Sequence, residues 1–139
     1  MCRVSYIPES FVKNCPESLI IKFLEYLEMV NGGHGNGFFY IDSSRLEKSV
    51  SIPIAELYKN PDKEGFLFHT RRRSHGPISD FLCHPFETED YIILHNGIWH
   101  NYHIFQNLLE IENNVSDSYV MAKIIQMFVS DFKIFKYNN

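Results

Sequence analysis

The order of the predicted strands and helices is the feature that most limits the fold of this chain. Three runs with strand character, Gly37–Ile41, Gly65–Arg73 and Tyr91–His95, follow one another along the sequence. Two segments with helical spacing, Tyr102–Ile111 and Ser118–Phe128, come after them. Strands followed by helices, without a repeated strand–helix–strand alternation, predict an α+β fold with layers and largely antiparallel sheets.

The N-terminal part of the chain adds another strand and a helix. Cys2–Ile7 has strand character, and Pro16 favours the first turn of a helix that Gly32-Gly33 would end. The last residues, Asp131–Tyr137, are compatible with a closing strand. We expect the first helix to bury the face that recurs at helical spacing, namely Leu19, Phe23, Leu27 and Val30.

Length and composition predict one domain. The chain has 139 residues, of which 45% are hydrophobic and which include 12 Phe and 8 Tyr, so we expect a single domain over residues 1–139 with an aromatic-rich core. The net charge of −4 gives no reason to expect nucleic acid or an anionic membrane as partner. No stretch approaches the roughly 20 apolar residues of a membrane span, and the N-terminus lacks the apolar core of a signal peptide. We therefore expect a cytoplasmic protein.

Cysteine and histidine residues raise the question of disulfides and metals. Cys2, Cys15 and Cys83 are an odd number of cysteines without close pairing, which predicts free thiols. Six of the seven histidines lie between His69 and His103, but the spacing His100-x-x-His103 has no matching pair at zinc-finger distance. We expect polar loop and pocket residues, with no metal and no cofactor. A metallonuclease is the weaker alternative.

Three consecutive arginines, Arg71-Arg72-Arg73, could indicate either nucleic-acid binding or recognition of a carboxylate. If the strand continues through them, Arg72 points away from its two neighbours, which divides the run instead of building a basic patch. The planar guanidinium of an arginine at a strand end can hold a carboxylate with two hydrogen bonds. We therefore expect no nucleic-acid partner.

Two further segments carry groups suited to catalysis. In His95-Asn96-Gly97, after an apolar strand, the Asn96 amide and the Gly97 N–H could stabilise one developing negative charge, although Asn-Gly is also the commonest turn dipeptide. Removal of Met1 would leave Cys2 with a free α-amino group. That amine titrates near pH 8, so the nucleophile and its base would belong to one residue.

Several motifs then occur in one order: Met1-Cys2-Arg3-x-x-Tyr6, His69-Thr70-Arg71-x-x-Ser74-x-Gly76, His84-Pro85-Phe86 and His95-Asn96-Gly97. In this order they resemble the class-II glutamine amidotransferases of the N-terminal nucleophile hydrolase superfamily. Gly35–Tyr40 looks like the Gly-rich strand start of that family, and Ser116-Asp117-Ser118 is similar to its Ser-Asp-Thr-Glu segment. With an arginine after Cys2, the sequence looks most similar to the stand-alone members of that family.

The resemblance implies a four-layer αββα sandwich, which the early end of this chain would leave truncated at the C-terminus. It also implies that Cys2 attacks a γ-glutamyl amide, that a thioester forms and that water releases glutamate. Asn96 and Gly97 then correspond to the oxyanion hole. The substrate-binding positions correspond to Arg71 for the α-carboxylate, Asp117 for the α-amino group, and Ser74 and His75 along the pocket.

Three functions remain open on the sequence. The first is a glutamine amidotransferase or glutaminase, whose partner would be glutamine and a separate synthetase subunit. The second is a hydrolase of γ-glutamyl peptides, which keeps the same nucleophile. The third is a degenerate domain that binds a ligand or partner without turnover, and retention of Met1 would favour it because a capped amine cannot act as the base.

Overall fold

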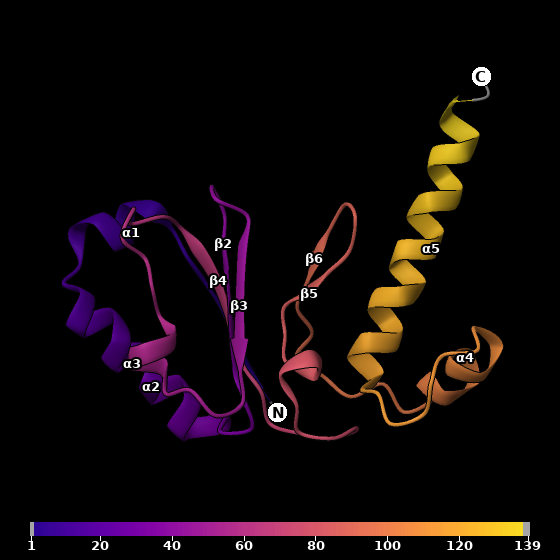
Figure 1. Cartoon of the computed structure of the whole chain (residues 1–139), viewed down its shortest axis with the longest axis horizontal. Coiled ribbons are helices and arrows are strands. Elements are labelled where there is room, and N and C mark those ends of the chain that lie inside the picture. The colour runs from indigo at the N-terminus through magenta and orange to yellow at the C-terminus, as the bar shows by residue number, and fades with distance from the viewer. Residues whose placement is uncertain (1, 138–139) are drawn as a thin grey trace.

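The computed structural model describes the backbone of residues 2–137 and the side chains of residues 2–129. Its elements, labelled in Figure 1 except for β1 and the short 3-10 helix η1, are in chain order β1 (Arg3–Ile7), α1 (Glu9–Asn14), α2 (Glu17–Asn31), β2 (Asn36–Tyr40), β3 (Arg45–Ser49), α3 (Ile54–Leu57), β4 (Phe66–Thr70), η1 (Asp80–Leu82), β5 (Phe86–Glu87), β6 (Ile92–Ile93), α4 (Tyr102–Leu108) and α5 (Asp117–Tyr137). None of the helices in the described part is long and apolar enough to cross a membrane.

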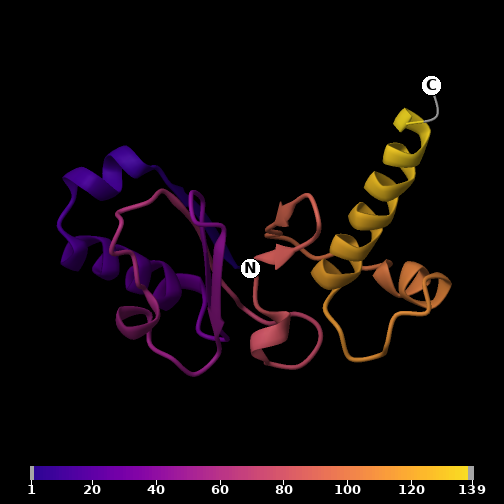
Figure 2. The same cartoon turned by 45° about the horizontal axis from the view of Figure 1, so that its top comes forward.

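A four-stranded antiparallel sheet organises the N-terminal half. Its strand order is β1-β4-β2-β3, with Arg3 opposite Thr70 and Asn36 also opposite Thr70. Helices α1, α2 and α3 lie on one side of this sheet (Figures 1 and 2). The central strands point alternate aromatic side chains into that layer, and these rings are fully buried: Phe38, Tyr40, Phe66 and Phe68. The fold is therefore mixed α and β with antiparallel sheets, as the order of elements predicted.

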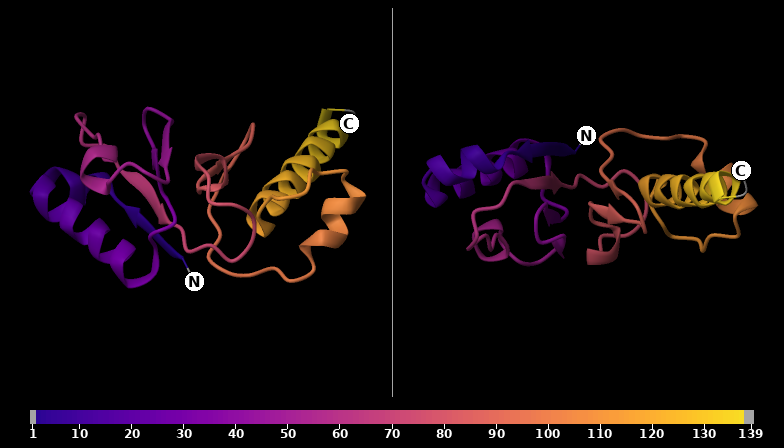
Figure 3. Two further views of the ribbon diagram at one scale, coloured as in Figure 1. Left: turned by 60° about the horizontal axis from the view of Figure 1, so that its bottom comes forward. Right: turned by 90° about the horizontal axis from the view of Figure 1, so that it is seen from above.

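The other half of the chain lies on the opposite side of this sheet. Strands β5 and β6 form a two-stranded antiparallel ribbon, and α4 and α5 lie beyond it (Figures 1 and 3). Gly37 on β2 allows close contact between the halves, because a Cβ at this position would overlap the His84 backbone carbonyl. A glycine is thus required where the backbone of the His84-Pro85 segment lies directly on the sheet.

The sequence predicted the ends of α2 but not its buried face. The helix begins after Pro16 and ends at Asn31, before Gly32, as expected. Ile20 and Leu24 are the buried residues, whereas the expected Leu19 and Val30 are exposed by 55% and 43%. Phe23 is also exposed and Leu27 is partly buried. Apolar residues surround most of this helix, so spacing alone did not distinguish the face that meets the sheet.

Other differences have equally local reasons. Residues 131–137 do not form a closing strand but continue α5, which contains neither Gly nor Pro to end it. The strand predicted for Gly65–Arg73 ends at Thr70, and that predicted for Tyr91–His95 consists of Ile92 and Ile93. Strand β3 was missed because its sequence, RLEKS, has mostly charged residues on an edge strand.

Candidate active site

Cys2 lies next to the chain segment that leaves β4. Pairing of Arg3 with Thr70 at the end of the β1–β4 ladder brings the residue before Arg3 close to the residues after Thr70. The Arg72 backbone N–H donates to Cys2 Sγ at 3.2 Å, and the thiol faces the Arg72 carbonyl oxygen at 3.6 Å. Met1, on whose removal the nucleophile hypothesis depends, lies outside the described residues.

A small cavity beside Cys2, named here the Cys2 cavity, gathers most of the predicted site residues. Its volume is about 10 Å³, which is about the space that one water molecule needs. A ligand larger than a water molecule therefore requires the surrounding loops to move apart. Six of the seven predicted residues line the cavity: Cys2, Arg71, Ser74, His75, Gly97 and Asp117.

Asn96 is the predicted residue that the structure does not bring into this cavity. It is exposed, and its side chain makes no hydrogen bond within the described part of the chain, whereas its neighbour Gly97 lines the cavity. The His95 ring packs over Gly97, since a Cβ there would lie 2.7 Å from His95 Nε2. In this conformation the Asn-Gly pair presents only the glycine to the site.

Arg71 is buried and already has partners. Its two terminal nitrogens donate to the carbonyl oxygens of His75 and Pro77, both at 2.8 Å, so it holds the loop after β4 in place. Burial lowers the pKa of Arg71 from its ordinary value, and the nearby Cys2 and Asp117 act in the opposite direction. A guanidinium has five N–H donors, so donors remain for a ligand beyond the two that hold the loop.

Arg72 and Arg73 differ from the buried Arg71 in being exposed. Arg71 is thus set apart from the other two, whereas the prediction set Arg72 apart, because β4 ends at Thr70 and the alternation of a strand does not extend to these residues. The Arg73 backbone N–H donates to His34 Nδ1 at 2.8 Å.

Asp117 begins α5 and is almost completely buried. Its Oδ2 accepts from the Trp99 backbone N–H at 2.8 Å, and its Oδ1 accepts from the Ser118 backbone N–H at 2.9 Å. The Ser118 hydroxyl in turn lies 2.9 Å from His95 Nδ1. Both carboxylate oxygens are therefore held in a fixed direction at the edge of the cavity, which suits a cationic ligand group.

No role in the site was predicted for five further residues that line the cavity, namely Arg72, His84, His95, Ser116 and Ser118. Their only signal was their position inside the quoted motifs or next to Arg71. His84 is the most unusual of them, because its buried ring lies 4.0 Å from the ring of His69. Neither nitrogen of His84 has a hydrogen-bond partner in the described part of the chain.

Burial dominates the electrostatics of this histidine pair. It lowers the pKa of His69 to about 3 and that of His84 to about 2. The backbone of His95 lies near His69 and weakly favours its charged form, but it makes no hydrogen bond of normal geometry with the ring. Both rings are therefore neutral at pH 7. Within the described residues, no group of three or more His, Cys, Asp or Glu side chains is arranged to hold a metal ion.

Comparison with known proteins gives distant relatives and no matching family model. The chain is 26% identical over 140 residues to a glutamine–fructose-6-phosphate aminotransferase (isomerizing) of Sulfolobus acidocaldarius, covering 95% of this chain and 24% of that protein. The proteins of the same name in Helicobacter pylori and Idiomarina loihiensis are 29% and 32% identical, over 91% and 76% of this chain and 22% and 18% of theirs.

The chain thus spans about a fifth to a quarter of the length of these relatives. It is a distant homologue of glutamine–fructose-6-phosphate aminotransferases over the part of their length that it matches, which supports a relation to glutamine amidotransferases.

Proposed function

We propose that this protein is a glutamine amidotransferase-type amide hydrolase in which Cys2, freed at its α-amino group by removal of Met1, is the nucleophile. The thiol loses its proton to that amine, and sulfur attacks the γ-carbonyl carbon of the substrate. The C–N bond breaks, the proton goes to the departing ammonia, and a thioester remains. Water then cleaves the thioester to release glutamate and restore the thiol.

The observation that supports this proposal best is the composition of the Cys2 cavity. A thiol, a buried guanidinium and a buried carboxylate line one space although they come from distant parts of the sequence. Arg71 and Asp117 carry the two charges that complement the α-carboxylate and α-amino groups of glutamine. In this proposal Ser74 and His75 line the side-chain path, and the distant homology to glutamine-using enzymes agrees with the substrate class.

Substrate entry requires movement of the loop that Arg71 holds by hydrogen bonds. Its guanidinium is tied to the carbonyl oxygens of His75 and Pro77, and the cavity is closed down to about 10 Å³. A substrate carboxylate that takes donors from Arg71 can replace these loop carbonyls. Residues 74–77 would then move outward, and Gly76, at φ +69°, supplies a backbone conformation that other residues rarely adopt.

The oxyanion hole is proposed to form from the Gly97 N–H and the Asn96 amide. Gly97 already lines the cavity, whereas the exposed Asn96 has to turn inward when substrate binds.

For the fold, we propose a four-layer αββα arrangement. Helices α1–α3, the main sheet, the β5–β6 ribbon and α5 succeed one another across the view in Figure 1.

Two alternatives use the same nucleophile. Hydrolysis of a γ-glutamyl peptide differs only in the leaving amine, and ammonia transfer requires a separate synthetase subunit or domain. A binding domain without turnover is the outcome if the α-amino group of Cys2 stays capped by Met1.

The test is covalent labelling combined with intact mass. Protein that has lost Met1 should react with a glutamine-like diazoketone at Cys2, and free glutamine should slow the reaction. Cys83 is an internal control, because burial raises its pKa to about 11 and keeps it a thiol. A Cys2→Ser variant should take no label and show no turnover of glutamine or γ-glutamyl dipeptides. Labelling of Cys15 or Cys83 with Cys2 untouched would refute the proposal.

A further inference from the structure

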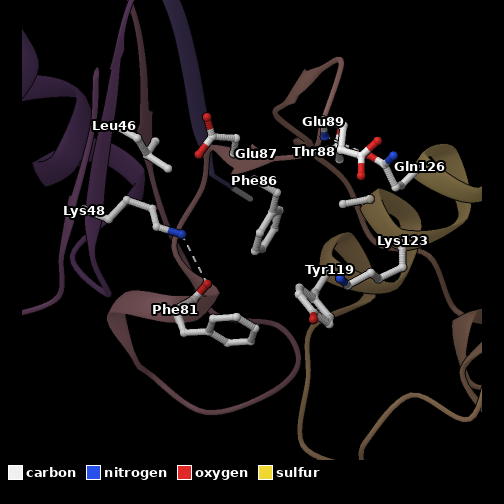
Figure 4. A pocket seen from close by; sticks show the side chains of 11 residues that line it. Leu46, Lys48, Phe81, Phe86, Glu87, Thr88, Glu89, Tyr119, Lys123 and Gln126 are labelled. Carbon is white, nitrogen blue, oxygen red and sulfur yellow. Dashed lines mark hydrogen bonds between the residues drawn. The ribbon is translucent and has the colours of Figure 1, made fainter. Parts of the chain in front are cut away.

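A second hollow lies beside β5 and is lined by Phe86, whose ring centroid is 4.6 Å from that of His84. It has a volume of about 430 Å³ and opens between β3, the segment from η1 to β5, and α5 (Figure 4). We call it the Lys48 cleft. Its lining shares no residue with that of the Cys2 cavity, and its volume falls in the range typical of small-molecule sites.

Aromatic rings form the floor and one side of the Lys48 cleft. Phe86 projects between the two walls in Figure 4, with its ring 5.8 Å from that of Tyr119 at 69°. Phe81 lies 4.9 Å from the same tyrosine ring. Phe81 is exposed, Tyr119 is partly exposed, and the almost completely buried Phe86 still lines the cleft, so another planar group can pack against these rings.

A lysine stands on each wall. Lys48 reaches in from β3 and Lys123 from α5 (Figure 4), and each ammonium lies 5.5 Å from a ring centroid, that of Phe86 for Lys48 and that of Tyr119 for Lys123. Neither lysine forms an ion pair among the side chains that the structure describes.

Lys48 is the more constrained of the two lysines. It is half-buried, and the one hydrogen bond that its ammonium donates within the described part of the chain is long, 3.3 Å, to the Phe81 carbonyl oxygen. Burial lowers its pKa, while electrostatic interactions with Cys83, Asp80 and Glu87 act to raise it. No described carboxylate lies within ion-pair distance of this ammonium, so an anion that enters the cleft can form a charge-assisted hydrogen bond with it.

Two exposed carboxylates limit the kind of anion that the Lys48 cleft can bind. Glu87 and Glu89 also line the cleft, and Figure 4 shows both at the end away from Phe81. They repel a ligand with several negative charges, such as a polyphosphate. A ligand with a single carboxylate can place that group near the lysines and its ring over the aromatic floor. Such a ligand fits both the charges and the shape of the cleft.

We propose that the Lys48 cleft binds a small aromatic monocarboxylate, with its ring against Phe86 and Tyr119 and its carboxylate on Lys48, assisted by Lys123. This site is separate from the proposed amide hydrolysis, so its test needs no turnover.

Binding is measured on the full chain by calorimetry and by two-dimensional NMR with indole-3-acetate as the probe. The matched probes are cyclohexylacetate, which lacks the aromatic ring, indole-3-acetamide, which lacks the charge, and inorganic phosphate, which is an anion alone. Indole-3-acetate should bind at least about tenfold more tightly than each of them.

Lys48→Met keeps the length of the side chain and removes its charge, and it should weaken indole-3-acetate binding about tenfold or more. Lys123→Gln should weaken binding less, and Lys22→Gln, an exposed lysine on α2, should leave it unchanged. Circular dichroism establishes that each variant is folded. Phosphate or cyclohexylacetate binding as tightly as indole-3-acetate, or unchanged affinity in folded Lys48→Met, would overturn the proposal. No detectable binding at about ten millimolar indole-3-acetate, a concentration far above the dissociation constant expected of such a pocket, would also overturn it.

Discussion

The buried histidine pair should make the protein sensitive to mild acid. The folded-state pKa values of about 3 for His69 and about 2 for His84 lie far below the ordinary 6.5. Above pH 6.5 both rings are neutral whether the chain is folded or unfolded, and they cause no pH dependence. Below pH 6.5 the unfolded chain binds protons that the folded protein does not, so the free energy of unfolding falls as the pH falls towards these folded values.

The size of this effect follows from the two pKa values. At about pH 5 each ring lowers the free energy of unfolding by about 2 kcal/mol relative to neutral pH, and the pair by about 4 kcal/mol. Domains of this size have a total of about 5–15 kcal/mol, so the loss is a large fraction of stability. Urea unfolding between about pH 5 and pH 7.5, followed by circular dichroism and Trp99 fluorescence, measures it directly.

Substitution of His84 tests whether the pH-dependent loss of stability comes from the histidine pair. His84→Phe keeps a ring between His69 and Phe86, whose centroids lie 4.0 and 4.6 Å from that of His84, and it should reduce the pH-dependent loss by about 2 kcal/mol. His84→Gln serves the same purpose if the phenylalanine does not fit. His103→Gln, at an exposed position, should retain the full pH dependence. A pH profile of either His84 variant identical to that of the unchanged protein would refute the reasoning.

Two further predictions concern the proposed chemistry. Arg71→Lys removes the fork that reaches both the His75 and Pro77 carbonyl oxygens, so KM for glutamine should rise about 10-fold to 100-fold and hydrogen exchange should quicken in residues 74–77; an unchanged KM would exclude substrate binding by Arg71. Asn96→Ala should lower kcat by roughly 10²–10³ with little change in KM, and because Asn96 is exposed the variant should be as stable as the original. An unchanged kcat would leave Asn96 as a turn residue only.

Local signals in the sequence were sufficient for part of the fold. Pro16 and Gly32 mark the limits of α2 because each acts through its own backbone chemistry. The buried face of α2 and the charged edge strand β3 were not predictable in this way, because both depend on what the sheet packs against. Continuation of α5 through residues 131–137 was hidden by apolar and aromatic residues that suit strands equally well.

For the candidate site, the sequence indicated which residues gather but not how they are held. Cys2, Arg71 and Asp117 were singled out from their motifs, and all three line one cavity. The loop carbonyls that occupy Arg71, the exposure of Asn96 and the stacking of His69 on His84 depend on contacts between distant segments. Periodicity and motif spacing contain no information about such contacts.

The position of Cys2 has a consequence for the order of events during synthesis. Its neighbours in the cavity belong to segments made much later, the last of them at the start of α5. Under the proposed function Met1 has to be removed, and Cys2 is synthesised long before Asp117. The thiol therefore passes through synthesis without the guanidinium and carboxylate that would select a substrate for it. Under the proposed function, hydrolysis begins only after β1 has paired with β4 and α5 has docked, so that turnover reports on the completion of folding.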